Sequence, residues 1–152
     1  MTIFRLNQDT FNFTKLFEEG LIGQSSSDFV HEKINFGDEL DHMHIVYNEK
    51  EVFASSPLLF IINDNIEQQF EIKRYAQLLK RGFILCFYNK QCSFTSNILE
   101  DSDKILAGLK YLKNRQIGNN YYIFSEGRYS GLIAMHLVNN NLFKFSIVKN
   151  PI

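Results

Sequence analysis

Ser125-Glu126-Gly127-Arg128-Tyr129-Ser130-Gly131-Leu132-Ile133-Ala134 is the stretch of sequence that decides the fold. It follows the apolar run at 121–124 and leads into a second, helix-like apolar run at 132–138. A short apolar run is typical of a buried strand, and glycine is typical of a sharp turn. The stretch therefore predicts a strand, a glycine-containing turn and a helix, in that order.

The same alternation of strand-like and helix-like segments continues outward from this stretch. Apolar runs predict further strands at 31–36, 43–47, 57–62, 83–88 and 143–148. Helical spacing of apolar residues predicts one helix at 68–80 and another that Asp101 or Ser102 caps. Strands that alternate with helices predict an α/β fold, a three-layer α/β/α sandwich with a mostly parallel sheet.

The length and composition of the chain are those of one globular domain. The 152 residues, with 45% hydrophobic and 22% charged residues, are enough for a single buried core. We expect a helical or loop segment over residues 1–30 and an α/β core over 31–152. The short helix in the first segment is predicted from apolar residues at 13, 16 and 17.

Charge and hydropathy exclude several classes of protein. A net charge of −1 lacks the basic character of a nucleic-acid binder, and no apolar run approaches a membrane span. The first residues have no signal-peptide pattern, so we expect a cytoplasmic protein. Cys86 and Cys92 fit neither a redox motif nor a zinc site, and nothing predicts a cofactor. We expect Cys86 to behave as a small buried hydrophobic residue.

The order of the predicted elements, with their local sequences, resembles the hydrolase domain of the prolyl oligopeptidase group of α/β-hydrolases. The resemblance covers residues 30–152 and is carried by the segments 57–65, 75–83, 105–122, 121–134 and 143–151. It implies a truncated α/β-hydrolase fold. It also implies a nucleophilic serine on a strained turn of the form G-x-S-x-G, followed along the chain by an acid and a histidine.

The turn of this chain departs from that pattern. If Ser130-Gly131 and Ala134 take the place of the small residues in G-G-x-x-A, the nucleophile position falls on Arg128. Neither Ser125 nor Ser130 has glycine two positions before and two positions after it. Those glycines matter because the strained turn leaves no room for side chains beside the nucleophile.

The remaining catalytic groups are also displaced. No acidic residue follows Glu126, and His136, the only later histidine, lies within the predicted helix. Asn63-Asp64-Asn65 replaces the glycine-rich oxyanion loop, where an aspartate disfavours a developing negative charge. Ser130, Ser125 and His136 are the candidate catalytic residues if the chain has a catalytic site.

Three functional hypotheses follow. The first is a degenerate, non-catalytic protein that acts through self-association or a partner, and the second is one part of a split serine hydrolase or peptidase. The third is a binder of small anions at the turn, with ligand contacts from Arg128, Tyr129, Asn63 and Asp64. For Arg128 itself we favour an ion pair with Asp64 or Glu126.

Two further features have competing interpretations. The strand at 143–148 is predicted to be a sheet edge that pairs with a second copy or a partner chain, unless residues 150–151 or the first helix cover it. His42 and His44 share one face of a strand. They fit a metal site with Asp41, but a solvated strand face is the favoured interpretation, and no metal is predicted.

Overall fold

The computed structural model describes residues 29–36, 41–65, 72–90 and 98–149 of the 152-residue chain. The six strands are β1 (Phe29–Asn35), β2 (Asp41–Asn48), β3 (Leu58–Asn63), β4 (Ile84–Lys90), β5 (Tyr121–Glu126) and β6 (Phe143–Lys149). The helices are η2 (Ile72–Tyr75), α3 (Ala76–Lys80), α4 (Ile98–Asn114), α5 (Arg128–Leu137) and η3 (Val138–Asn140).

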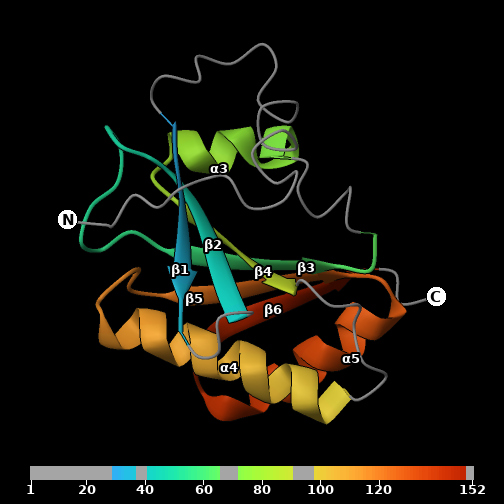
Figure 1. Cartoon of the computed structure of the whole chain (residues 1–152). Coiled ribbons are helices and arrows are strands. Elements are labelled where there is room, and N and C mark those ends of the chain that lie inside the picture. Colours follow the sequence, from blue (N-terminus) through green and yellow to red (C-terminus); the bar gives the residue numbers. More distant parts are fainter. Residues whose placement is uncertain (1–28, 37–40, 66–71, 91–97, 150–152) are drawn as a thin grey trace.

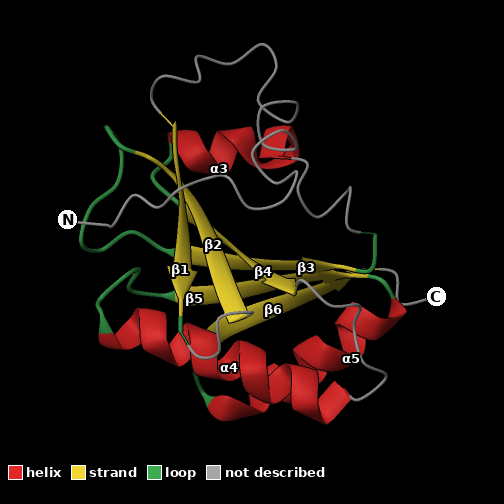
Figure 2. Ribbon diagram, in the orientation of Figure 1, coloured by secondary structure: helices red, strands yellow, loops and turns green. Residues whose placement is uncertain are grey.

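One mixed sheet organises these elements. Its strand order is β1-β2-β4-β3-β5-β6, in which β1, β2 and β4 pair antiparallel and β4, β3, β5 and β6 pair parallel. α3 covers one face of the sheet and α4 and α5 cover the other (Figure 1; Figure 2). The α/β fold and the three-layer arrangement that the alternation predicted are therefore confirmed.

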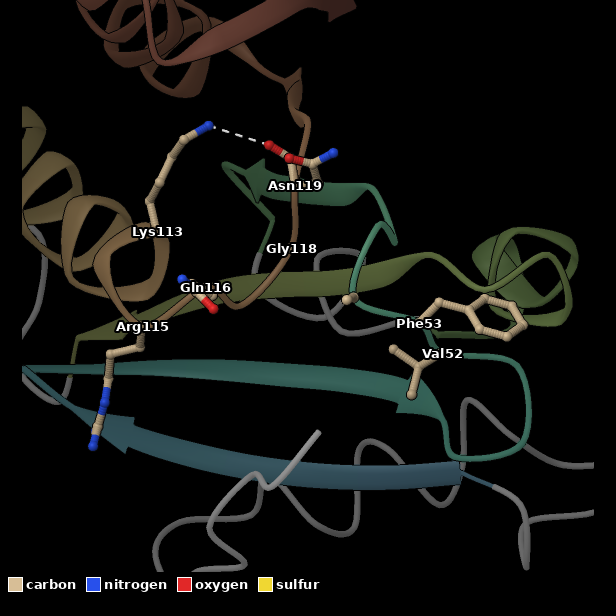
Figure 3. A pocket seen from close by; sticks show the side chains of 8 residues that line it. Val52, Phe53, Lys113, Arg115, Gln116, Gly118 and Asn119 are labelled. Carbon is tan, nitrogen blue, oxygen red and sulfur yellow. Dashed lines mark hydrogen bonds between the residues drawn. The ribbon is translucent and has the colours of Figure 1, made fainter.

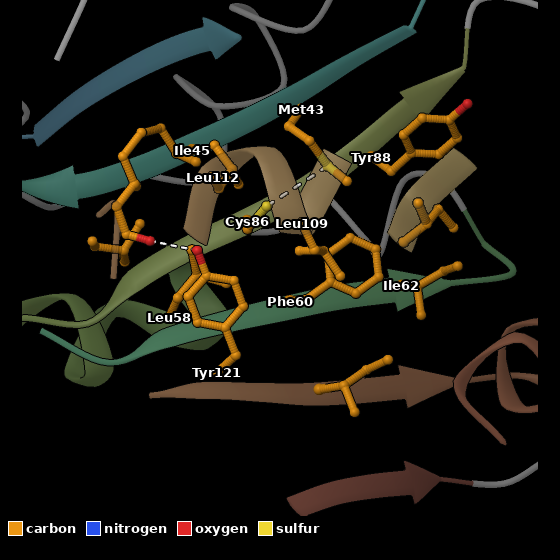
Figure 4. Close-up of a cluster of buried hydrophobic side chains, with 14 of the residues drawn as sticks. Met43, Ile45, Leu58, Phe60, Ile62, Cys86, Tyr88, Leu109, Leu112 and Tyr121 are labelled. Atoms are coloured by element: carbon orange, nitrogen blue, oxygen red, sulfur yellow. Dashed lines mark hydrogen bonds between the residues drawn. The ribbon is translucent and has the colours of Figure 1, made fainter. Parts of the chain in front are cut away.

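The apolar runs form strands because both faces of the sheet are covered. β3 presents alternate residues to two buried clusters, Phe60 to the cluster under α4 and α5 and Ile61 to the cluster under α3. Figure 4 shows the larger cluster, in which Leu109 and Leu112 of α4 pack over β3 and β4. A strand buried on both faces needs a continuous apolar sequence, which is why β3 shows no alternation of polar residues.

Cys86 lies inside this larger cluster, as predicted. It is fully buried, its thiol donates a weak hydrogen bond to the sulfur of Met43 at 3.8 Å, and burial raises its pKa. Tyr121 is also fully buried, and its hydroxyl donates to the backbone oxygen of Ile117 at 2.5 Å (Figure 4). Both residues are therefore structural.

The start of α4 differs from the prediction. The helix begins by Ile98, so Asp101 and Ser102 lie inside it and are buried instead of capping it. The expected helix at 68–80 is described only from Ile72, as η2 followed by α3. The predicted helix in the first thirty residues, Cys92 and residues 150–151 lie outside the described residues. None of the described helices combines the length and apolar character that a membrane crossing requires.

The prediction of a solvated face for His42 and His44 is wrong. The two side chains are 3% and 1% exposed. His44 stacks on His31, with 2.9 Å between its Nδ1 and the Nε2 of His31, and His42 shares a hydrogen bond with Asn35. In the described part of the chain, no three His, Cys, Asp or Glu side chains gather as metal ligands would. The histidines here are packed groups of the sheet face on the α3 side.

Acid is expected to destabilise the protein through this histidine pair. Burial lowers the pKa of His31 from 6.5 to about 4, and burial followed by the nearby charges of His31, His42 and Lys33 lowers the pKa of His44. Because the unfolded chain binds the proton more tightly, stability is complete above about pH 6.5 and is lost as the pH falls towards about 4. For His31 alone the loss approaches about 3 kcal/mol at the acid limit.

Urea unfolding at about pH 7 and about pH 4.5 measures this effect. His31→Asn should flatten the dependence of the unfolding free energy on pH, whereas the same change at the exposed His136 should leave it intact. Equal slopes for wild type and His31→Asn would contradict the assignment.

Candidate functional site

The turn between β5 and α5 is the place where the fold concentrates polar contacts. β5 ends at Glu126, α5 begins at Arg128, and Gly127 between them has φ +112°. A Cβ on Gly127 would lie 2.7 Å from the Cβ of Asp64 and closer still to its carboxyl group. The strained position of the turn is therefore Gly127, which carries no side chain, and the prediction that placed Arg128 there is wrong by one residue.

The carboxylate of Asp64 fills the amino end of α5. The backbone N–H groups of Tyr129 and Ser130 donate to its Oδ2 and Oδ1 at 3.1 and 2.8 Å, and the Ser130 hydroxyl donates to Oδ1 at 2.7 Å. These amides are among the unpaired donors that begin every α-helix, and a negative charge is favoured there. Asp64 thus caps α5 from the end of a neighbouring strand.

This cap has a chemical consequence. In an α/β-hydrolase the loop after the corresponding strand donates an N–H to the oxyanion. Here the same loop brings a carboxylate, whose oxygens accept hydrogen bonds from the amides of Tyr129 and Ser130 and whose charge would oppose an oxyanion formed beside them. The turn therefore holds the chain's own carboxylate at the amino end of α5.

Glu126 organises the rest of the carboxyl edge of the sheet. It accepts a hydrogen bond from Nδ2 of Asn63 at 2.9 Å and forms ion pairs with Arg74 at 3.2 Å and Lys149 at 3.3 Å. Burial alone would raise its pKa, but the hydrogen bonds and charges of Arg74 and Lys149 outweigh burial and lower it. The group links the ends of β3, β5 and β6 to η2.

Tyr129 attaches the first turn of α5 to α4. Its hydroxyl donates to the buried carboxylate of Asp101. Burial, together with this hydrogen bond and the charge of Asp101, raises the pKa of Tyr129. Sequence reasoning missed this contact because it read Asp101 as a local helix cap, whereas its partner is 28 residues away.

Arg128 does not form the ion pair that the sequence favoured. Its side chain is exposed, and among the described residues it pairs with neither Asp64 nor Glu126. Asp64 does lie beside the turn, as that prediction required. Its carboxylate accepts from the backbone amides of Tyr129 and Ser130 and from the Ser130 hydroxyl instead of from the Arg128 guanidinium. The hypothesis that the turn binds a small anion needs free backbone amides at the start of α5, but those of Tyr129 and Ser130 already donate to Asp64.

The candidate catalytic residues do not meet. Ser130 bonds Asp64, and Ser125 is fully buried with a hydroxyl that has no hydrogen-bond partner in the described part of the chain. His136 is exposed in the last turn of α5, at the end away from Gly127. The three other histidines of the chain lie on β1 and β2. Within the described residues, no serine hydroxyl is hydrogen-bonded to an imidazole.

Comparison with known proteins supports the fold alone. No family model and no curated protein sequence matches the chain. Oligopeptidase B from Trypanosoma brucei matches with a TM-score of 0.68 at 12% identity, over 86% of this chain and 21% of that one. Esterase B from Lactobacillus rhamnosis matches with a TM-score of 0.58 at 14% identity, over 91% and 51%. An epoxide hydrolase from Vigna radiata matches with a TM-score of 0.60 at 11% identity, over 82% and 41%.

These structures have one architecture and different activities. The chain has the α/β-hydrolase fold, as the resemblance implied, and it spans between a fifth and about half of the length of these proteins. One fold hosts many functions, so activity must be argued from the turn and its contacts.

Proposed function

We propose that this chain is a non-catalytic protein built on the α/β-hydrolase scaffold, which acts by associating with a second chain. The observation that carries the first half of the proposal is the Asp64 carboxylate on the amides of α5. A serine hydrolase needs an unblocked oxyanion site, a nucleophile on the strained turn and an imidazole beside it. Two features of the described residues support the proposal: the strained position is Gly127, which has no side chain, and no imidazole is hydrogen-bonded to a serine hydroxyl there.

A fluorophosphonate probe tests the absence of catalysis. Such probes react covalently with serines that an imidazole activates. We expect no adduct on the intact protein by mass spectrometry, because the hydroxyl of Ser130 is bonded to a carboxylate and that of Ser125 is buried. An adduct that disappears in Ser130→Ala or Ser125→Ala would overturn the proposal and favour the split serine hydrolase.

The second half of the proposal rests on the edge strand β6 and the helix beside it. β6 is the terminal strand of the described sheet, and α5 packs next to it. Leu132 and Met135, three residues apart on α5, are 42% and 61% exposed. The terminal strand of the described sheet can pair with a strand of another chain, and the exposed apolar groups of α5 can bind the same partner. A second copy of this chain is the partner that we propose.

Sedimentation of the wild type and of a Leu132→Lys/Met135→Lys variant tests this association. The double substitution should weaken self-association about tenfold or more, because two apolar contacts are replaced by like charges. Leu99→Lys is the matched control, since Leu99 is 60% exposed on α4. A wild type that stays monomeric at high concentration would contradict the proposal, as would equal weakening by Leu99→Lys.

A further inference from the structure

A groove lies at the opposite edge of the sheet from Gly127. Two adjoining pockets of about 600 and about 430 Å³ share Lys113 and Asn119 and run past the first residues of β5 and β6. Figure 3 shows the larger one between the end of α4 and the connection from β2 to β3. The groove is separate from the polar network at the carboxyl edge of the sheet.

The charged side chains that line the two pockets are all cationic in the described part of the chain. Among the residues that the structure describes, no Asp or Glu lines either pocket. Lys113 and Lys144 line the smaller pocket and form no ion pair with any carboxylate that the structure describes. Amide side chains supply most of the other polar groups: Gln116, Asn119, Asn120 and Asn141. Such a lining favours an anionic ligand.

Two contacts hold the ammonium group of Lys113 in position. Its Nζ donates to the backbone oxygen of Asn119 at 3.2 Å (Figure 3). The same Nζ lies 5.0 Å from the centre of the Tyr121 ring. A lysine ammonium has three donors, so one hydrogen bond leaves two for a ligand. The ring and the carbonyl fix the ammonium without neutralising its charge.

Backbone hydrogen bonds hold the lining residues Asn119 and Asn120 against the start of β3. The N–H of Asn119 donates to the backbone oxygen of Ser56 at 2.9 Å, and the N–H of Leu58 donates to that of Asn120 at 2.8 Å. Gly118 has φ +79°, and a Cβ there would lie 2.8 Å from the Cβ of Leu58. A site whose backbone is fixed before binding loses little entropy when a ligand enters.

The far wall of the groove is apolar. Val52 and Phe53 come from the connection between β2 and β3, across the groove from α4 (Figure 3). Phe53 is 65% exposed, the largest exposed fraction among the exposed apolar side chains of the described residues. An exposed aromatic ring that lines the same pocket as Lys113 is suited to a ligand with an apolar part and a charged part.

We propose that this groove binds a small phosphate monoester that carries an aromatic or aliphatic group. The phosphate lies between Lys113 and Lys144 and takes further hydrogen bonds from the asparagine amides, and its apolar group contacts Val52 and Phe53. Two point-charge ammonium groups match a doubly charged phosphate better than a singly charged carboxylate.

Titration with phenyl phosphate, followed by backbone amide NMR, tests the proposal on the full chain. We expect saturable shifts confined to the groove, at residues 52–53, 113, 116–120 and 141–144. Lys113→Met and Lys144→Met should each weaken binding about fivefold to tenfold, as expected when a charge-assisted hydrogen bond is lost in a solvent-open site. Lys110→Met is the matched control, because Lys110 is exposed on the same helix outside the groove, and its binding should equal that of the wild type.

Several outcomes would overturn the proposal. Equal binding of benzoate would contradict the preference for a doubly charged group, and equal binding of inorganic phosphate would contradict the contact with Phe53. Shifts spread over the whole surface, or the same loss in Lys110→Met as in Lys113→Met, would mean non-specific attraction of anions. Binding of an acidic peptide without binding of phenyl phosphate would replace the small ligand by a protein partner.

Discussion

Replacing Gly127 by alanine is expected to lower the free energy of unfolding by about 3–5 kcal/mol, the largest effect of any single change at the turn. Two causes combine. A side chain at φ +112° is strained, and its Cβ would overlap the carboxyl group of Asp64. The second cause forces Asp64 off the amides of α5, so the cap is lost along with the turn. Urea unfolding of the purified variant measures the change.

A double-mutant cycle separates these two causes. Asp64→Gly removes the overlapping atoms, so Gly127→Ala should cost at least about 1 kcal/mol less in that background than in the wild type. The strain of the positive φ remains in both backgrounds. Strictly additive effects would show that Asp64 does not occupy the space beside Gly127.

Asp64→Ala alone should cost about 2–3 kcal/mol, because three hydrogen bonds to a charged acceptor at a helix terminus are lost together. Asp64→Asn should cost about 1 kcal/mol less than Asp64→Ala, since an amide oxygen still accepts hydrogen bonds but without the charge.

The control for this prediction is Asp103→Ala. Asp103 is exposed on α4, and its loss should change stability by no more than about 0.5 kcal/mol. A similar cost for both aspartates, measured by urea unfolding, would mean that the cap on α5 contributes nothing beyond an ordinary surface charge.

Much of the fold could be predicted because its signals are local. β3 and β5 are continuous apolar runs that end in polar turn residues, and such runs suit strands covered on both faces. The start of α4 could not be predicted in the same way. Asp101 looks like a helix cap in the sequence, but it is buried because Tyr129 reaches it from another helix.

The candidate site was predicted in outline and missed in detail. Asp64 follows β3 and the turn follows β5, and these two strands pair parallel. Because the carboxyl ends of paired parallel strands lie side by side, the sequence could predict that Asp64 is close to the turn. The groups that donate hydrogen bonds to Asp64 depend on which residue occupies the strained position of the turn. Aligning Ala134 with the alanine of G-G-x-x-A predicted Arg128 there, whereas the structure has Gly127. Burial of His42 and His44 was missed because a polar strand residue reveals nothing about what packs on its face.

The contact between Asp64 and Ser130 also bears on the order of folding events. It joins residues 66 positions apart, across parallel strands that must first be brought into register. Interactions that close such long loops form after the transition state more often than local helical contacts do. Their removal mainly accelerates unfolding and leaves the refolding rate almost unchanged. The carboxylate at the end of β3 therefore slows unfolding, so it sets the lifetime of the native chain more than the rate at which that chain folds.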